Sequence, residues 1–348
     1  MLRQRSSQSG AALILVLWTF AVLSALAAEF ARAMREEAQS ALNFKQETLA
    51  HYVAVAAINE ALLALQAYNG ELEVDSQEPD GGVTRTTEAP DEEEAQRLQP
   101  IRTLLQGTGA WVEGSFGGTP YEVRAIDESG KVPLNAPQVE EQLLQRILLN
   151  LGYDEDVAAT VSDSILDWRD EDDLHRTKGA EDDYYEDLER PYQSKDAPFS
   201  TIEELLLVRG VTEEMFHGTH GTPGLKDVFS AVARTRHLTL RSISPEVEYA
   251  LCGTAPDEDE TGSGMNERRL GAGQAEAEED LATCLATTGL GSRRGERGGN
   301  AALSTATVEA RVKEEGGRIL THIGMTVHFK GSGFRTVYWY DAVFPDET

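Results

Sequence analysis

Residues 10–28 read GAALILVLWTFAVLSALAA, an apolar run without a charged side chain that follows the basic leader MLRQRSSQS. At a helical rise of about 1.5 Å per residue, residues 11–28 would span about 27 Å, close to the hydrocarbon thickness of a bilayer. Neither Gly nor Pro occurs in residues 11–69, so the same helix is expected to continue for about 88 Å. No ordinary domain buries a helix of that length. Its first half must lie in lipid or against other helices, and its second half must carry the remaining chain.

The chain as a whole is strongly acidic, with a net charge of −29 over 348 residues. This balance argues against nucleic acid as a partner, because binding it needs clustered Lys and Arg. It also argues against docking of the head on anionic lipid. The leader carries Arg3 and Arg5, and basic residues on the short N-terminal side favour an orientation that places the bulk of the chain across the membrane.

The apolar run admits three interpretations. A cleaved signal peptide would use the A-x-A site Ala25-Leu26-Ala27, but the apolar core is long and the helical pattern continues through that site. The second interpretation is an uncleaved anchor. The third rests on Gly10, which would let a membrane peptidase accept an extended backbone just before the run.

Beyond the apolar run the helix becomes amphipathic, with one apolar stripe at spacings of three and four. The stripe consists of Val55, Ile58, Leu62 and Leu65. We expect it to pack on the head of the same chain, with a neighbouring subunit as the alternative. Asn69-Gly70 is expected to end the helix. Residues 71–99 carry ten acids against two arginines, which predicts a solvated linker.

Sheet patterns lie on both sides of a helical region. Alternation predicts strands in 111–116 and 121–127 around Gly117-Gly118, and a C-terminal antiparallel meander from 304–315, 318–329 and 334–344. Residues 236–244, RHLTLRSIS, predict one more strand, and 251–302 is expected to be an irregular loop rich in Gly and acids.

Three helices are expected between the strands. The first has Asn135 as its N-cap and ends before Gly152. The second has an apolar face formed by Val157, Val161, Ile165 and Trp168. The third occupies 200–208, where Ser200 and Glu203 are expected to form a capping box.

Two cysteines occur in the chain and no CxxC motif, which excludes a zinc ribbon and a thioredoxin-type site. Cys252 and Cys284 bracket part of the irregular loop. A disulfide between them would stabilise that loop by about 3 kcal/mol, and two free thiols are the alternative.

Residues 163–189 form the most charged region, with twelve acids and three bases. A solvated acidic loop would explain this density. Calcium would explain it too, because that ion needs six to eight oxygen ligands. EF-hand spacing is excluded, since Leu174 stands where a side-chain ligand would fall and no Gly follows. The interleaved aromatic side chains of Trp168, Tyr184 and Tyr185 favour a structured loop.

Motifs of enzyme chemistry do not occur in the sequence, which contains no GxxxxGK[ST], GxSxG or HExxH. Carboxylate pairs inside the acidic loop carry no specificity, because any acidic cluster contains them. A non-enzymatic protein is therefore expected.

The leader, Gly10, the apolar run and the long helix together resemble the N-terminus of type IV pilins and pseudopilins. The resemblance implies cleavage by the prepilin peptidase after Gly10 and N-methylation of Ala11. Most members have Glu at the fifth mature position, which is Leu15 here. K-type minor pseudopilins of type II secretion, the GspK family, typically lack this Glu, which suits a subunit at the tip that no other subunit precedes.

Residues 121–216 also resemble the GspK family, in DESGKVPLNAP and in LDWRDED…GAEDDYY. The resemblance implies that the helical domain binds calcium, as one or two ions, near these acids. The candidate ligands are Asp167, Asp170, Asp172, Glu181 and Asp182.

The resemblance implies an α+β fold, in which a type IV pilin-like N-terminal helix packs on an antiparallel sheet with a large inserted α-helical domain. The expected divisions are a leader (1–10), a helical spine (11–70), an acidic linker (71–99), a discontinuous β domain (100–134 and 236–345) that contains the loop 251–302, and a helical insertion (135–235).

The implied role is that of a minor pseudopilin at the tip of the pseudopilus, in the inner membrane with a single pass and with its C-terminal head in the periplasm. The implied partners are the I- and J-type minor pseudopilins, the H-type and major pseudopilins, and the prepilin peptidase. The alternative is a membrane-anchored periplasmic module or hydrolase that depends on calcium.

Overall fold

The structure is a computed structural model that describes residues 9–76, 103–104, 107, 109–219, 221–233, 238, 242–253, 274–290, 303–314, 317–330 and 333–341. The expected linker 71–99 lies outside the described residues beyond residue 76, and so does most of the stretch 254–302 apart from one helix.

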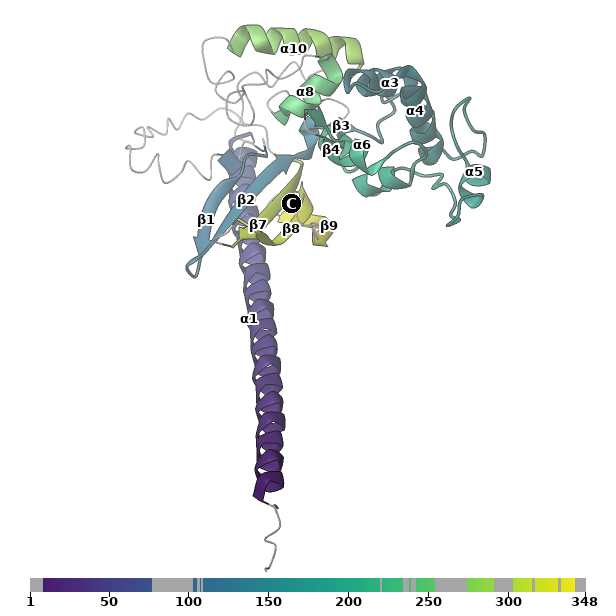
Figure 1. Cartoon of the computed structure of the whole chain (residues 1–348). Coiled ribbons are helices and arrows are strands. Elements are labelled where there is room, and N and C mark those ends of the chain that lie inside the picture. The colour runs from purple at the N-terminus through teal and green to yellow at the C-terminus, as the bar shows by residue number, and fades with distance from the viewer. Residues whose placement is uncertain are drawn as a thin grey trace, which may run out of the picture.

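A single long helix dominates the molecule. α1 (Ser9–Ser76) has 68 residues and extends as a rod from the head (Figure 1). It continues through Gly70 to Ser76, so the predicted end at Asn69-Gly70 is wrong. One Gly inside a helix costs only about 1 kcal/mol relative to Ala, which the residues on either side can offset.

The head contains a five-stranded antiparallel sheet in the order β1-β2-β7-β8-β9. Its strands are β1 (Val112–Phe116), β2 (Thr119–Asp127), β7 (Thr305–Lys313), β8 (Ile319–Lys330) and β9 (Gly333–Asp341). Gly117 and Gly118 both have positive φ in the first hairpin, as a tight primed turn requires. The predicted hairpin and C-terminal meander are confirmed.

One face of the sheet packs on the C-terminal half of α1. Ile58, Leu62 and Leu65 are fully buried there, together with several alanines that let the helix approach the strands closely. Val123, Val308 and Ile323 form part of the opposing surface. The predicted packing of the apolar stripe on the head of the same chain is confirmed, with Val55 at its edge and only partly buried.

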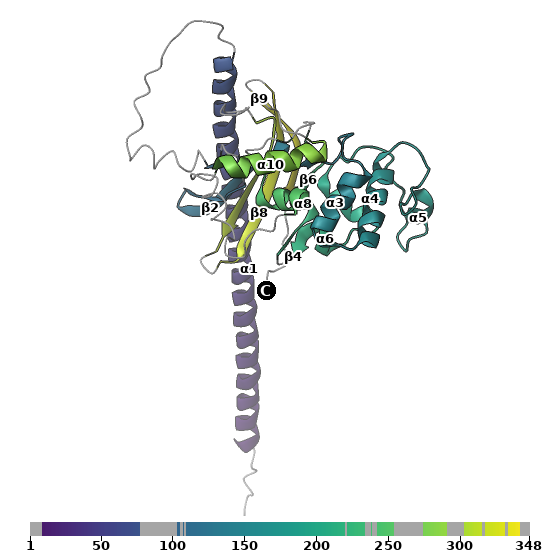
Figure 2. The same cartoon turned by 90° about the horizontal axis from the view of Figure 1, so that it is seen from above.

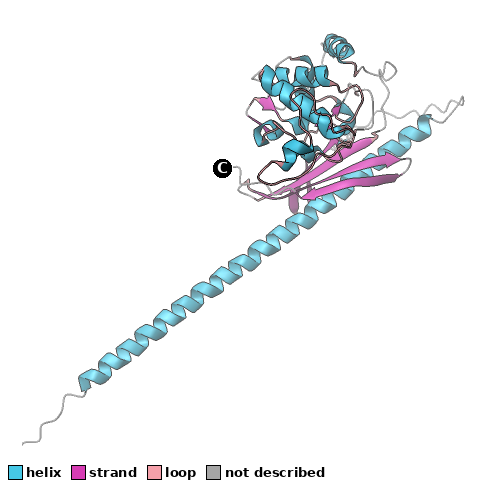
Figure 3. Cartoon of the chain, turned by 90° about the vertical axis from the view of Figure 1, so that its right-hand side faces the viewer, coloured by secondary structure: helices cyan, strands magenta, loops and turns pink. Residues whose placement is uncertain are grey.

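The helical domain leaves the sheet after β2 and returns at β7, and these two strands pair directly, Asp127 beside Ala306. Seen from above, α3, α4, α5 and α6 lie to one side of α1, whereas α10 passes across it in this view (Figure 2). In Figure 3 the sheet lies between α1 and the helical domain.

The elements of the helical domain surround a second core. In chain order they are η1 (Glu128–Gly130), β3 (Val132–Pro133), α3 (Glu141–Asn150), α4 (Glu155–Arg169), α5 (Asp182–Glu186), η2 (Ile202–Leu207), α6 (Glu213–His217), β4 (Gly218–Thr219), β5 (Thr222–Pro223), α7 (Leu225–Val228), β6 (Phe229–Ser230), α8 (Pro245–Cys252) and α10 (Gln274–Thr288). β3 pairs in parallel with β6, which joins the start of the domain to the segment that follows α7. The predicted α+β fold with an inserted helical domain is confirmed.

The helical domain is larger than predicted, because residues assigned to the β domain belong to its core. Leu238 and Ile243, in the expected strand 236–244, are buried among the helices, and the described part of 236–244 does not join the five-stranded sheet. The stretch 251–302 is not wholly irregular either. It contains α10, whose Leu281 and Leu285 are buried against the same core. Few apolar residues mark the buried face of α10, and Gly and Glu surround them. The sequence pattern therefore does not reveal this helix.

Two predicted helix starts are also wrong. α3 begins at Glu141, because residues 135–139 form turns first, with Val139 N donating to Ala136 O. Asn135 is therefore not an N-cap. The capping box of η2 uses Thr201 and Glu204, one residue later than predicted.

Candidate functional site

The N-terminal half of α1 is the first candidate site. Every side chain from 13 to 47 is exposed in the isolated chain. Among the described residues α1 is the one helix that is long and apolar enough to cross a membrane, by length and composition alone, and its most apolar window is not buried in the fold. A surface of this kind needs lipid or other helices to cover it.

The expected processing positions lie at the start of this helix. Gly10 and Ala11 are both inside α1. Leu15 is 65% exposed, so the position that carries Glu in most pilins presents an aliphatic side chain to its surroundings.

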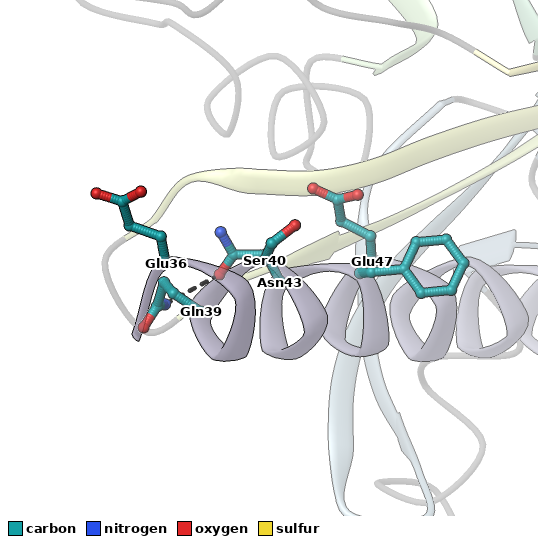
Figure 4. A pocket seen from close by; sticks show the side chains of 6 residues that line it. Glu36, Gln39, Ser40, Asn43 and Glu47 are labelled. Carbon is teal, nitrogen blue, oxygen red and sulfur yellow. Dashed lines mark hydrogen bonds between the residues drawn. The ribbon is translucent and has the colours of Figure 1, made fainter. Parts of the chain in front are cut away.

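A shallow groove of about 500 Å³ lies on α1 between the apolar run and the sheet (Figure 4). Among the described residues, its lining comes from this one helix: Glu36, Gln39, Ser40, Asn43, Phe44 and Glu47. Gln39 Nε2 donates to Asn43 Oδ1 at 3.1 Å. One helix cannot enclose a ligand, so this groove is a surface for packing rather than a small-molecule site.

The acidic loop after α4 is the second candidate site. Asp167, on the last turns of α4, has no exposed surface. Its Oδ2 accepts a hydrogen bond from the Arg176 backbone N at 3.0 Å, and its Oδ1 accepts one from Arg176 Nη1 at 2.5 Å. The same Nη1 lies 2.7 Å from Asp170 Oδ2. Burial raises the pKa of Asp167 and the neighbouring Asp170 adds to this, although the hydrogen bonds and charge of Arg176 act against it.

Gly179 fixes the path of the loop over Asp167. A Cβ at this position would collide with the Asp167 carboxylate, so only glycine lets the backbone pass so closely. This contact brings the next residues, Ala180 and Glu181, into the core.

Glu181 is the most unusual group of this region. It is 3% exposed, and neither carboxylate oxygen has a hydrogen-bond partner with good geometry. Burial raises the pKa of Glu181 to about 7; a hydrogen bond from the nearby Ser194 acts against this rise, and the charges of Asp167, Asp170 and Asp196 add to it. A buried carboxylate without a partner is costly unless a cation or a proton balances it.

Of the five predicted ligands, Asp167 and Asp170 share one partner, Arg176 Nη1, and Glu181 is linked to them only through the effect of their charges on its pKa. Asp172 is exposed and accepts a hydrogen bond from Leu174 N at 3.0 Å, so it does not face the cluster. Asp182 faces another segment and accepts from Ser194 N at 2.8 Å and Ser194 Oγ at 3.0 Å. Within the described ranges, no three His, Cys, Asp or Glu side chains converge as a metal site would require.

Two residues near the cluster were not predicted. Asp163, one turn before Asp167, is buried, and its Oδ1 lacks a partner while Oδ2 accepts from Lys178 N at 3.0 Å. Asp163 lies four residues before Asp167 and therefore on the same face of α4, which could have predicted that it is near the cluster. Arg176 is the basic residue that pairs with Asp167 and Asp170. Its position in the middle of the acidic run could have predicted this pairing.

Aromatic side chains pack along the loop. Trp168 and Tyr185 meet edge to face with centroids 5.3 Å apart, and Tyr185 stacks on Tyr192 at 5.2 Å. The Arg209 guanidinium lies 4.6 Å from the centroid of Tyr184. The predicted structured loop is consistent with this packing.

Cys252 and Cys284 are joined by a disulfide bond, with their Cα atoms 6.0 Å apart. The bond connects the end of α8 to α10 across a separation of 32 residues. Both cysteines lie in the helical domain, so the bond attaches α10 to that core.

Together these features define a class of protein: a pilin-like chain with one candidate membrane helix, a sheet on that helix and a helical domain inserted into the sheet. Residues 121–218 match the family model of the type II secretion system (T2SS), protein K. Over these residues the chain is similar to the type II secretion system protein K family, in agreement with the resemblance noted in its sequence.

Two curated relatives are similar over part of their length. The putative type II secretion system protein K of Escherichia coli K12 is 25% identical over 211 residues, 61% of this chain and 60% of that protein. Type II secretion system protein K of Pectobacterium carotovorum subsp. carotovorum is 31% identical over 100 residues, 28% of this chain and 30% of that protein. The matches thus span less than two thirds of either relative.

Among solved structures, the GspK-GspI-GspJ complex from the enterotoxigenic Escherichia coli type 2 secretion system contains a chain that aligns with a TM-score of 0.48 and 11% identity. The alignment covers 72% of this chain and 95% of that chain.

Proposed function

We propose that this chain is a minor pseudopilin at the tip of the type II secretion pseudopilus, where it initiates or caps assembly for the export of folded proteins across the outer membrane. The observation that carries this proposal is the division of α1. Residues 13–47 are exposed, whereas one face of the part that follows, through Leu65, is buried under the sheet. An apolar rod with a head at one end is suited to lateral packing among similar rods.

The position at the tip is supported by Leu15 and by the width of the head. A subunit with no carboxylate at Leu15 has no group to meet the N-terminal amine of a preceding subunit. The helical domain widens the head on one side of α1 (Figure 2). A subunit stacked above it would have to accommodate this domain.

The role is structural rather than enzymatic. The expected partners are the I- and J-type minor pseudopilins, with the H-type and major pseudopilins further along the filament. The prepilin peptidase would cleave after Gly10 and methylate Ala11, and the head would lie in the periplasm.

Copurification from detergent extracts tests the assembly role. The full chain should form a stable complex with the I- and J-type subunits of its own secretion system and should form no filament alone. Met34→Glu places a charge on the exposed apolar surface of α1 and should reduce recovery of the complex several-fold. Leu174→Glu changes an exposed Leu of the head and should leave recovery unchanged. Long filaments of this chain alone, or equal effects of both variants, would contradict the proposal.

We further propose that the acidic loop binds calcium. The unpartnered oxygens of Glu181 and Asp170 favour this role, since calcium takes carboxylate oxygens as ligands. Asp167, Asp170 and Glu181 are the candidate ligands, and these side chains would have to converge for the ion to bind, because they form no metal-ligand cluster within the described residues.

Thermal unfolding of the full chain in detergent micelles, with calcium or with a chelator, tests this second role. Millimolar calcium should raise the unfolding midpoint of the head, because a ligand that binds only the folded state stabilises it. An unchanged midpoint together with no heat of binding in calorimetry would rule calcium out.

A further inference from the structure

We propose that an apolar patch at the β9 edge of the sheet receives the N-terminal helix of a neighbouring subunit, which runs parallel to α1. The patch consists of Phe334 and Trp339 of β9 with Met325 and Phe329 of β8, and we call it the edge patch. This inference rests on the proposed assembly role and specifies which part of the head meets an adjacent subunit.

The pairing of β8 with β9 places the edge patch on the face of the sheet that packs on α1. Phe334 lies opposite Phe329, and Trp339 lies opposite Met325. Residues directly opposite each other in an antiparallel pair share one face. Met325 and Phe329 pack against the core between α1 and the sheet, and the rings of Phe329 and Phe334 meet edge to face at 6.2 Å. All four side chains therefore lie on the same side of the sheet as α1.

The tyrosines of β9 belong to the opposite face. Tyr338 lies opposite Thr326, and Tyr340 lies opposite Gly324. The hydroxyl of Tyr340 donates to Glu309, and Thr326 exchanges a hydrogen bond with Thr307. β9 thus has one polar face, which is engaged within the head, and one apolar face.

The apolar face of β9 is exposed, unlike that of the strands beside it. Val308, Ile323 and Val327 lie on the same face of the sheet and are fully buried, whereas Phe334 is 37% exposed and Trp339 is 38% exposed. The position of the helix explains this difference. α1 packs on β1, β2, β7 and β8, and β9 lies beyond them at the edge of the sheet, to one side of α1 (Figure 1).

Lipid does not account for this exposed surface. Ala50 is the first buried residue of α1, and the sheet packs on the helix from there onward. At a rise of about 1.5 Å per residue, Ala50 lies about 33 Å along the helix from Ala28, where the apolar run ends. With the apolar run in the membrane, the edge patch lies outside the hydrocarbon. Another protein surface must cover it.

A helix of the same kind as α1 fits the edge patch in chemistry and in direction. The face that the patch extends already packs on one helix through apolar side chains. α1 itself shows what such a helix offers at this level, since Leu49, Tyr52 and Leu63 are exposed beside its buried stripe. Subunits that are anchored in one membrane by N-terminal helices hold these helices parallel. A neighbouring helix that packs along α1 would therefore reach the head and pass over β9.

Photocrosslinking tests the contact. p-Benzoylphenylalanine replaces Phe334 in the full chain, which is coexpressed with the I- and J-type subunits of its own secretion system. After irradiation, mass spectrometry should find the crosslinked peptide in the N-terminal helix of one of these subunits, beyond its apolar run. The matched control carries the same group at Phe116, an exposed Phe of β1 at the other edge of the sheet, and should give no such crosslink.

Copurification from detergent extracts gives a second measurement. Trp339→Glu should reduce recovery of the complex by about tenfold, because a charge replaces an aromatic anchor of the interface. Arg335→Glu changes an exposed residue of the same strand, opposite His328 on the polar face, and should leave recovery unchanged.

The outcomes separate this inference from the assembly role. A crosslink from position 334 to a second copy of this chain, to another segment of the same chain or to a partner's head alone would overturn the inference. Equal recovery of Trp339→Glu and the unmodified chain would overturn it too. If Trp339→Glu does not fold, the crosslink from position 334 decides. In each of these cases recovery of the unmodified complex still supports the assembly role, whereas failure to recover any complex overturns both.

Discussion

Glu309 on β7 is the centre of a polar network on the face of the sheet that is turned away from α1. Its Oε2 accepts a hydrogen bond from Arg124 Nε at 2.6 Å and lies 3.4 Å from His322 Nε2. The hydroxyl of Tyr340 donates to its other oxygen. Burial by itself raises the pKa of this carboxyl, but the hydrogen bonds of His322 and Tyr340 and the charge of Arg124 outweigh it, so the pKa lies well below the ordinary 4.5.

Glu309→Gln should therefore lower the free energy of unfolding at pH 7 by about 3 kcal/mol, because it leaves Arg124 without its buried partner. The folded-state pKa is the lower one, so this contribution is present above about pH 4.5 and is lost as the pH falls. The difference between wild type and variant, measured by urea unfolding of the full chain in micelles, should shrink between about pH 5 and pH 3. A difference that does not change with pH would contradict the assignment.

The matched control is Glu314→Gln. Glu314 pairs with Arg318 at 3.3 Å, and both side chains are largely exposed. Its loss should change the free energy of unfolding by less than about 0.5 kcal/mol.

Asn135 joins three segments of the helical domain. Its Nδ2 donates to Phe199 O and to Ala231 O, both at 2.8 Å, and its Oδ1 accepts from Phe199 N at 2.8 Å. The sequence predicted an N-cap at this position, where Asp serves as well as Asn.

Asn135→Asp distinguishes the two roles. A carboxylate cannot donate to the two carbonyl groups and would repel them, so we expect a loss of about 2–4 kcal/mol in the free energy of unfolding. Thermal unfolding of the variant measures this loss. Stability equal to that of the wild type would instead support the N-cap assignment.

Single residues were predicted well where a local pattern sets their role, and poorly where a distant contact does. The acidic run of 163–189 and the family resemblance pointed to Asp167 and Glu181 as candidate calcium ligands, and that role stays a prediction. It could not indicate that Arg176 would fold back between two of these acids, because that contact depends on the path of the loop past Gly179. Asn135 failed as a prediction for the same reason, since its partners lie 64 and 96 residues away.

At the scale of elements, α10 depends on the core of the helical domain and on one covalent bond. Leu281 and Leu285 are buried against that core, and Cys284 is bonded to Cys252 of α8. The rest of the connection between the two helices lies outside the described residues.

Reduction of this disulfide should release α10 first. The Cys252→Ser variant should lose on the order of 3 kcal/mol, as expected for a closed loop of this length. Hydrogen exchange in α10 should accelerate by at least about tenfold, while exchange in α4 should change little. Equal exchange in α10 with and without the bond would contradict this role. Mass spectrometry without reduction checks that the bond forms in the purified chain.

Elements with a strong and uniform period were predicted correctly. The strands around Gly117-Gly118 and the C-terminal meander alternate clearly, and β1, β2, β7 and β8 each pack on α1. Residues 236–244 also alternate, yet Leu238 and Ile243 are buried among helices. A short alternating stretch fits either environment, and tertiary packing decides between them.

At the scale of the whole molecule, the chain has two parts: the exposed residues 13–47 of α1, and a head that packs on the later part of the same helix. α1 carries the exposed apolar surface at one end and the sheet at the other (Figure 1). The helical domain is inserted between β2 and β7, whose direct pairing leaves the sheet continuous. The insertion can therefore vary in size without disturbing the packing of the sheet on α1.

This arrangement could be predicted from the sequence because its main cause is local: an uninterrupted helical pattern longer than any domain can bury. The extent of the helical domain could not, since its last members, α8 and α10, follow a stretch that reads as sheet and loop. Their assignment depends on tertiary contacts: α8 packs on α3, and α10 packs on α8 and is joined to it by the disulfide.

The mature N-terminus tests the central claim most directly. The full chain, produced in cells with a type II secretion system and its prepilin peptidase, should begin at N-methylated Ala11 when it is analysed by mass spectrometry. Gly10→Leu should block cleavage, whereas Ser9→Ala should not. A mature chain that begins at Met1 or at Ala28 would contradict the account, because it would identify the apolar run as an anchor or a signal peptide rather than a pseudopilin spine.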